Sequence, residues 1–182
     1  FELSTLGGWI ATRSSGQQSY HYGRIENLFA GGRMESPAGP LELPVFPASA
    51  AGPDLKQLVL GSEGRLGIIT QASVRIRPLP EVDDFYGVFF PDWLSGIDAV
   101  RRIAQQQIPL SMLRLSDPQE TATTLALSGK ERLVGLAQHG LKLLGLGDEP
   151  CLLVYGVTGS QSAAQAARRQ ANAILRRHGG LQ

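Results

Sequence analysis

The sequence has 182 residues, 42% of them hydrophobic, which is enough for one ordinary domain or two small ones with a real core. Lysine and arginine total 17 and aspartate and glutamate total 16, and this balance excludes the net positive field that attracts nucleic acid or an anionic membrane. No apolar run is long enough for a transmembrane segment. The single cysteine, Cys151, excludes an internal disulfide and is typical of a reducing compartment, so we expect a cytoplasmic protein.

The first 80 residues predict short helices and strands. The expected elements are, in chain order, a helix at 6–15 ending at Gly16, a loop at 17–23, a strand at 25–35, a turn at 36–39, a hairpin partner at 41–43, an irregular excursion at 44–53 and a helix at 55–60 capped by Asp54. A strand then follows, with Ile68, Thr70, Ala72, Val74 and Ile76 on one face. Pro78 and Pro80 end this strand, and residues 81–84 are the expected domain boundary.

The remaining residues predict a second module. The expected elements are an aromatic strand at 85–90, a helix with the apolar stripe Ile97, Val100 and Ala104, a strand at 110–115, a helix at 133–144, a strand at 151–157 and a final helix with a capping box at Ser162 and Gln165. The apolar face of that final helix is expected to be Ala164, Ala167, Ala171, Ile174 and Leu175. This order is most of a split βαβ, ferredoxin-like module, and the fold class is therefore α+β.

Two glycine-bearing, hydroxyl-rich segments are the most informative motifs. The first, residues 4–16, reads Ser-Thr-Leu-Gly-Gly-Trp-Ile-Ala-Thr-Arg-Ser-Ser-Gly, and the second, residues 61–70, reads Gly-Ser-Glu-Gly-Arg-Leu-Gly-Ile-Ile-Thr. Glycine lets backbone N–H groups approach a phosphate or a flat heterocycle, and hydroxyls add donors without bulk. The alternatives are a glycine-capped helix end for the first segment and a tight turn before a strand for the second. No lysine follows these glycines, so the second segment is not a Walker loop.

Arg114 is the third candidate because it stands between leucines on an expected buried strand. A buried guanidinium is costly unless it is paired. One interpretation is a structural salt bridge to Asp117 or Glu120, and the other is a functional role for Arg114 in binding an anionic group.

The other polar residues predict no site. His21, His139 and His178 lack metal-ligand spacing, so no metal is expected. Cys151 opens an apolar strand and is expected in the core, and the loop tyrosines Tyr20 and Tyr22 are weak candidates for a cofactor contact. The arginines of the last helix read as a solvated face, namely Arg168, Arg169, Arg176 and Arg177.

The two glycine segments and the Arg-Leu-x-Asp run at Arg114 resemble the vanillyl-alcohol oxidase, or PCMH-type, FAD-binding flavoproteins, and most of all their alkyldihydroxyacetonephosphate synthase branch. This resemblance implies that residues 1–80 are the second half of the FAD-binding domain and that residues 81–182 begin the cap domain over the substrate. It implies FAD as the cofactor and Arg114 as a catalytic residue near the flavin. The cofactor-binding residues that it implies are Ser4, Thr5, Gly7, Gly8, Thr12, Arg13, Ser14, Ser15, Glu63, Gly64, Arg65, Leu66, Gly67, Ile68 and Ile69.

At one position the sequence departs from the family. Arg65 stands where most members of the family carry threonine or another small residue. This difference puts the side-chain contact at this position in question but not the backbone contacts. A pairing of Arg65 with a phosphate is a hypothesis.

The resemblance leaves two activities open on one scaffold. A synthase replaces the acyl chain of acyl-dihydroxyacetone phosphate with a fatty alcohol, with no net redox change, whereas sister enzymes oxidise a 2-hydroxy acid and pass a hydride to the flavin. A third hypothesis is a non-catalytic interaction module.

The sequence begins inside a motif and ends directly after a helix, so we expect a portion of a larger enzyme that is inactive by itself. The resemblance implies that the pyrophosphate loop, the histidine cluster and the catalytic tyrosine of that enzyme lie elsewhere. A homodimer also stays open.

Overall fold

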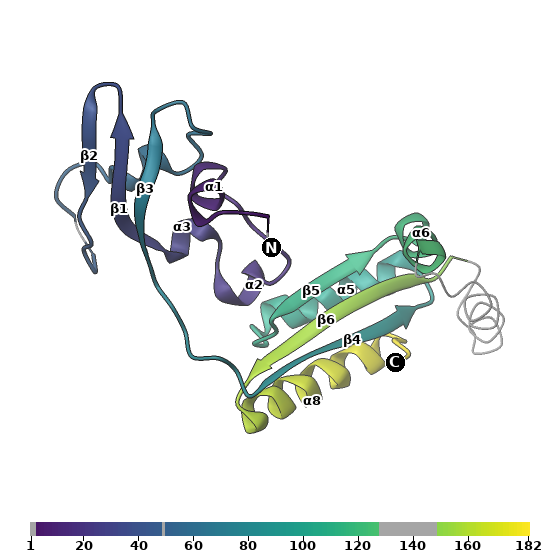
Figure 1. The fold of residues 1–182 in the computed structure, drawn as a ribbon. Coiled ribbons are helices and arrows are strands. Elements are labelled where there is room, and N and C mark those ends of the chain that lie inside the picture. The colour runs from purple at the N-terminus through teal and green to yellow at the C-terminus, as the bar shows by residue number, and fades with distance from the viewer. Residues whose placement is uncertain (1–2, 49, 128–148) are drawn as a thin grey trace. The chain divides into compact units, whose positions relative to one another are not determined.

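The computed structural model describes residues 3–48, 50–127 and 149–182 (Figure 1). The chain forms two compact units, Phe1–Pro78 and Leu79–Gln182. Each unit has its own sheet and its own buried core. Within the described ranges, no helix combines the length and the apolar character that crossing a membrane requires.

The first unit is built on a three-stranded antiparallel sheet with β1 in the centre. Its strands are β1 (Phe29–Ser36), β2 (Gly39–Leu43) and β3 (Ile68–Val74), and its helices are α1 (Leu6–Ala11), α2 (Ser19–Tyr22), α3 (Ile25–Leu28) and α4 (Lys56–Val59). The predicted hairpin is confirmed: Ser36 pairs with Gly39, and the Ser36 hydroxyl donates to the Gly39 carbonyl at 2.7 Å. The core consists of Ile10, Ile25, Phe29, Met34, Leu43, Val59 and Leu60.

Three elements of the first 36 residues differ from the sequence expectation. The first helix stops at Ala11 instead of residue 15, because Arg13 adopts a left-handed backbone with φ 52°. The expected strand at 25–35 begins instead as α3, because the Arg24 amide donates to the side chain of Asn27 at 2.9 Å and caps a helical turn. The expected loop at 17–23 contains the short helix α2.

The predicted single apolar face of the third strand is wrong because β3 carries a bulge. Met34 pairs with Ile69 and Arg33 pairs with Gln71, so Thr70 is left over between them. The extra residue reverses the alternation of side chains at that point. Ile69 and Ala72 therefore pack against the core, whereas Ile68 is 74% exposed.

The second unit is a three-stranded sheet in the order β4-β6-β5, with β6 antiparallel to both neighbours. The strands are β4 (Val82–Phe90), β5 (Met112–Ser116) and β6 (Cys151–Gly159), and the helices are α5 (Trp93–Gln105), α6 (Pro118–Leu127) and α8 (Gln161–Arg177). Because β4 and β5 are parallel, connected through α5 and separated by β6, the arrangement is the predicted split βαβ (Figure 1). On the other edge of β4, the amide of Leu181 donates to the Phe89 carbonyl at 2.9 Å.

One face of this sheet carries the core together with α5 and α8. The predicted apolar face of α8 is confirmed, because all five of its residues are buried. Its cap is Ser160, whose side chain accepts from the Ala163 amide, and not the predicted Ser162. The stripe on α5 is shifted by one residue, to Gly96, Ala99 and Ile103, with Val100 partly buried. Gly96 lies in the interface because a side chain there would meet Leu115, at 2.9 Å from an added Cβ. The helix expected at 133–144 lies outside the described residues.

We expect Gly67→Ala to destabilise the first unit by more than about 2 kcal/mol, since Gly67 has φ 156° and an added Cβ would lie 2.1 Å from the Glu35 carbonyl oxygen. Urea unfolding, followed by Trp9 fluorescence in a Trp93→Phe background, measures this change. Gly16→Ala is the matched control, because nothing lies within 4 Å of its added Cβ. Equal midpoints for the two variants would contradict the prediction.

Candidate functional site

The two glycine segments lie against each other in the first unit. The Gly61 amide donates to the Ile10 carbonyl at 3.1 Å, and the Glu63 amide donates to the Ala11 carbonyl at 2.9 Å. At the other end of α1, an added Cβ on Gly7 would lie 3.7 Å from the Cβ of Ile69. Segments about fifty residues apart in sequence therefore form one continuous surface.

The backbone of both segments is shaped locally. Thr5 caps α1, because its side-chain oxygen accepts from the Gly8 amide at 3.1 Å. In the second segment Gly61, Glu63 and Gly64 all have positive φ angles, of 77°, 51° and 78°. Nothing lies within 4 Å of an added Cβ at Gly64, so this turn presents its backbone to an open surface.

Most of the predicted cofactor-binding residues are accessible. The exposed ones are Ser4, Thr5, Gly8, Thr12, Ser15, Glu63, Gly64, Arg65, Leu66 and Ile68. The partly buried ones are Gly7, Arg13, Ser14, Gly67 and Ile69. The surface thus combines open backbone with two exposed aliphatic side chains, those of Leu66 and Ile68.

Two of the predicted hydroxyl donors act inside the loop. The Thr12 hydroxyl donates to the Gly8 carbonyl at 2.9 Å, and it lies 2.7 Å from the hydroxyl of Ser14. These contacts shape the turn after α1. Thr5 is different, because a hydroxyl that accepts from the Gly8 amide can still donate its own hydrogen.

Arg13 turns its side chain toward two residues that sequence reasoning missed. Its Nε forms an ion pair with Glu26 Oε2 at 2.6 Å, and its Nη2 donates to the side-chain oxygen of Gln57. Neither partner is signalled by a motif, and Gln57 is 44 residues away. Only the folded chain brings the three together.

Arg114 lies on the sheet face opposite to α5 and α8. Its neighbours Leu113 and Leu115 pack against the core, so alternation directs Arg114 the other way. The side chain is 44% exposed rather than buried, and it is paired with Glu120, one of the two partners expected from the sequence. Val154 on β6 pairs with Arg114 on β5 and, on its other side, with Gly87 on β4. Because Gly87 has no side chain, this row across the sheet carries the side chains of Arg114 and Val154 alone.

Glu120 is the electrostatic partner that keeps Arg114 in place. The hydrogen bond from Arg114, followed by one from Ser116, holds the pKa of the Glu120 carboxyl below its ordinary value. Asp117 caps the start of α6 by accepting from the Glu120 amide at 2.7 Å. This cap positions the carboxylate on the first turn of the helix.

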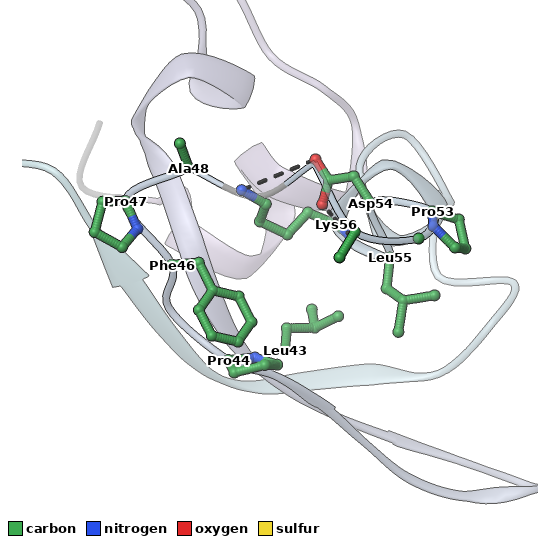
Figure 2. Close-up of a pocket in the computed structure, with 11 residues that line it drawn as sticks. Leu43, Pro44, Phe46, Pro47, Ala48, Pro53, Asp54, Leu55 and Lys56 are labelled. Atoms are coloured by element: carbon green, nitrogen blue, oxygen red, sulfur yellow. Dashed lines mark hydrogen bonds and ion pairs between the residues drawn. The ribbon is translucent and has the colours of Figure 1, made fainter.

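A cavity of about 190 Å³ lies in the first unit under the proline-rich excursion (Figure 2). Leu43, Phe46 and Leu55 give it an apolar wall, and Lys56 extends toward the carboxylate of Asp54, with Nζ 3.9 Å from Oδ2. Pockets for cofactors and drug-sized ligands are usually larger than about 300 Å³. We therefore assign no cofactor to this cavity.

The weaker sequence candidates have local explanations. Partial burial, and next the charge of Arg77, lowers the pKa of His21, and His178 Nδ1 lies 2.9 Å from the Ile174 carbonyl at the end of α8. His139 lies outside the described residues. Cys151 is buried, as predicted, and burial raises the pKa of its thiol. Within the part of the chain that the structure describes, no three His, Cys, Asp or Glu side chains gather as metal ligands.

Comparison with known proteins identifies the relatives of this chain. The family model for FAD linked oxidases, C-terminal domain, matches residues 79–182. An alkyldihydroxyacetonephosphate synthase of Dictyostelium discoideum is 43% identical over 126 residues, which covers 69% of this chain and 21% of that protein. A solved structure of alkyldihydroxyacetonephosphate synthase superimposes with a TM-score of 0.85 and 34% identity, covering 100% of this chain and 33% of that one.

A weaker similarity connects the chain to a different activity. A mitochondrial cytochrome-type D-lactate dehydrogenase of Arabidopsis thaliana is 30% identical over 129 residues, covering 70% of this chain and 23% of that protein. The chain spans between a fifth and a third of the length of the curated relatives it matches.

The Arg114–Glu120 contact predicts a pH dependence. Because the pKa of Glu120 is lowered in the folded protein, the contact is complete above the ordinary glutamate value of 4.5 and is lost only as the pH falls well below it. We expect Arg114→Met to return the pKa of Glu120 toward 4.5. Carbon-13 NMR titration of the glutamate carboxyls measures it, with Glu120→Gln to assign the signal. An unchanged titration in Arg114→Met would refute the contact.

Proposed function

The chain belongs to the family of FAD-linked oxidases, and from this membership we propose that it is a portion of an alkyldihydroxyacetonephosphate synthase-like flavoenzyme. The observation that carries the proposal is that one solved synthase structure covers the whole chain. The proposed enzyme binds FAD and exchanges the acyl chain of acyl-dihydroxyacetone phosphate for a fatty alcohol.

The residues of the first unit fit FAD. The joined glycine segments offer an open backbone at Gly64, and small or hydroxyl-bearing residues belong to the same surface. The exposed side chains of Leu66 and Ile68 suit the apolar face of a flat heterocycle. When bound, the flavin supplies an electron-accepting ring that protein side chains lack. We propose that the residues of both segments, apart from the side chain of Arg13, hold this cofactor.

We further propose that the two units have different tasks. Residues 1–80 are the second half of the FAD-binding domain, and residues 81–182 are the beginning of the cap domain that covers the substrate. The division of the chain into Phe1–Pro78 and Leu79–Gln182 supports this assignment, as does the family match that starts at residue 79.

In the cap, we assign Arg114 to the substrate. Its guanidinium is exposed on the sheet face opposite to α5 and α8, where a planar fork can bind a phosphate or carboxylate through two parallel hydrogen bonds. Glu120 holds the arginine from one side and limits the directions that it can take. The chain's own contribution to the reaction is therefore to bind and orient an anionic group.

A second candidate function is oxidation of a 2-hydroxy acid by the same flavin scaffold. It is supported by the similarity to a D-lactate dehydrogenase, and a carboxylate would suit Arg114 as well as a phosphate does. The lower identity of this relative makes it the weaker proposal. We also propose that the enzyme is a homodimer and that it is cytoplasmic. The free thiol of Cys151 is in keeping with a reducing compartment.

The visible absorption spectrum of the full-length protein tests the cofactor first. We expect a flavin spectrum that stays unchanged when a 2-hydroxy acid is added anaerobically, because the synthase reaction has no net redox change. A spectrum that bleaches would instead select the hydroxy-acid dehydrogenase. A protein without flavin, even after incubation with FAD, would refute both proposals.

Arg114→Lys should lower turnover about tenfold or more while leaving the melting temperature within about 2 °C, since lysine cannot reproduce a two-point contact. Steady-state kinetics on the full-length enzyme and thermal unfolding measure the two effects. Arg101→Lys is the matched control, because Arg101 forms an exposed ion pair with Asp98 in the same unit. If Arg114→Lys turns over as fast as the wild type, Arg114 does not bind the substrate.

A further inference from the structure

We propose that Arg13 is a positioning residue, whose side chain holds the two glycine segments together and does not contact the cofactor. The inference rests on the proposed binding of FAD and adds a role that the family resemblance does not give. The side chain of Arg13 turns toward Glu26 on α3 and Gln57 on α4.

Both partners use the guanidinium at once. Nε forms the ion pair with Glu26 at 2.6 Å, and Nη2 donates to Gln57. Arg13 has two partners, whereas Glu120 is the one partner described for Arg114, so a phosphate at Arg13 would have to displace Gln57 and also compete with the carboxylate of Glu26. The observed contacts therefore favour an internal role over a contact with the FAD pyrophosphate.

The contacts continue on both sides of Arg13. Arg24 reaches the same carboxylate, with Nη1 3.6 Å from Glu26 Oε1, and its Nη2 donates to the backbone carbonyl of Arg13 at 3.4 Å. On the other side, the side-chain amide of Gln57 donates from Nε2 to Oδ2 of Asp54 at 3.5 Å. A chain of polar contacts thus runs from α3, across the end of α1, to the beginning of α4.

The backbone around Arg13 explains why this chain of contacts matters for the site. With φ 52°, Arg13 reverses the chain directly after α1, and an added Cβ on Gly61 would lie 3.6 Å from its Cβ. Helix α4, which carries Gln57, leads within two residues into Gly61. A residue that holds Gln57 therefore holds the start of the second glycine segment against the end of the first.

A double-mutant cycle on FAD affinity tests the inference. The variants are Arg13→Ala, Gln57→Leu and the pair together, made in the full-length protein, with FAD titrated into the apoprotein and followed by flavin fluorescence. We expect Gln57→Leu to weaken FAD binding about tenfold, Arg13→Ala to weaken it at least as much, and the double change to weaken it hardly more than Arg13→Ala, because the contact of Gln57 is already lost when Arg13 is removed. The milder variant Glu26→Gln should weaken binding in the same direction, which keeps the test usable if Arg13→Ala folds poorly.

A matched control and a spectroscopic signature separate this role from a general loss of stability. Arg33→Ala removes an arginine with two carboxylate partners, Glu35 and Glu42, on the hairpin of the same unit, and it should leave FAD affinity unchanged. The visible circular dichroism of bound flavin should change in Arg13→Ala and Gln57→Leu alike, since both shift the same loop.

Three results would overturn the inference. If Arg13→Ala weakens FAD binding while Gln57→Leu and Glu26→Gln do not, Arg13 contacts the cofactor directly. If the variants lower the melting temperature of the apoprotein but leave FAD affinity unchanged, the cluster serves folding alone. If the wild-type protein binds no FAD, the proposed function fails, and this inference fails with it.

Discussion

Two backbone hydrogen bonds, from the amides of Gly61 and Glu63 to the carbonyls of Ile10 and Ala11, join the candidate site. The last carbonyls of a helix have no partner within the helix, so they must find donors elsewhere. Here the second glycine segment supplies those donors, and in doing so it is placed beside the first. These two hydrogen bonds therefore place the second glycine segment beside the end of α1.

In the second unit the central strand β6 has the corresponding role. It separates the parallel strands β4 and β5, and its alternate residues divide the sheet into two faces. The helices α5 and α8 cover one face, and their small residues let the layers approach closely. The other face is left to display Arg114, so the same alternation that builds the core also presents the candidate catalytic side chain.

Backbone strain gathers where the proposed cofactor site lies. Among the described residues, three non-glycine residues have positive φ angles, and two of them, Arg13 and Glu63, belong to the joined glycine segments. Such conformations cost about 1–3 kcal/mol each and persist only where surrounding contacts enforce them. At Arg13 the enforcing contacts come from Glu26 and Gln57, and at Glu63 from the Ala11 carbonyl. The strain and the polar contacts therefore point to the same surface.

The sequence by itself determined the α+β class, the hairpin, the split βαβ order and the buried face of α8, because these depend on local turn residues and on periodicity. It also singled out both glycine segments and Arg114. Only the tertiary structure decided that Thr70 is a bulge, that the stripe on α5 is shifted by one residue, and that Arg13 pairs with Gln57. The reason is physical: periodicity records which side of an element is apolar, whereas bulges, close helix contacts and long-range ion pairs depend on partners that are distant in the chain.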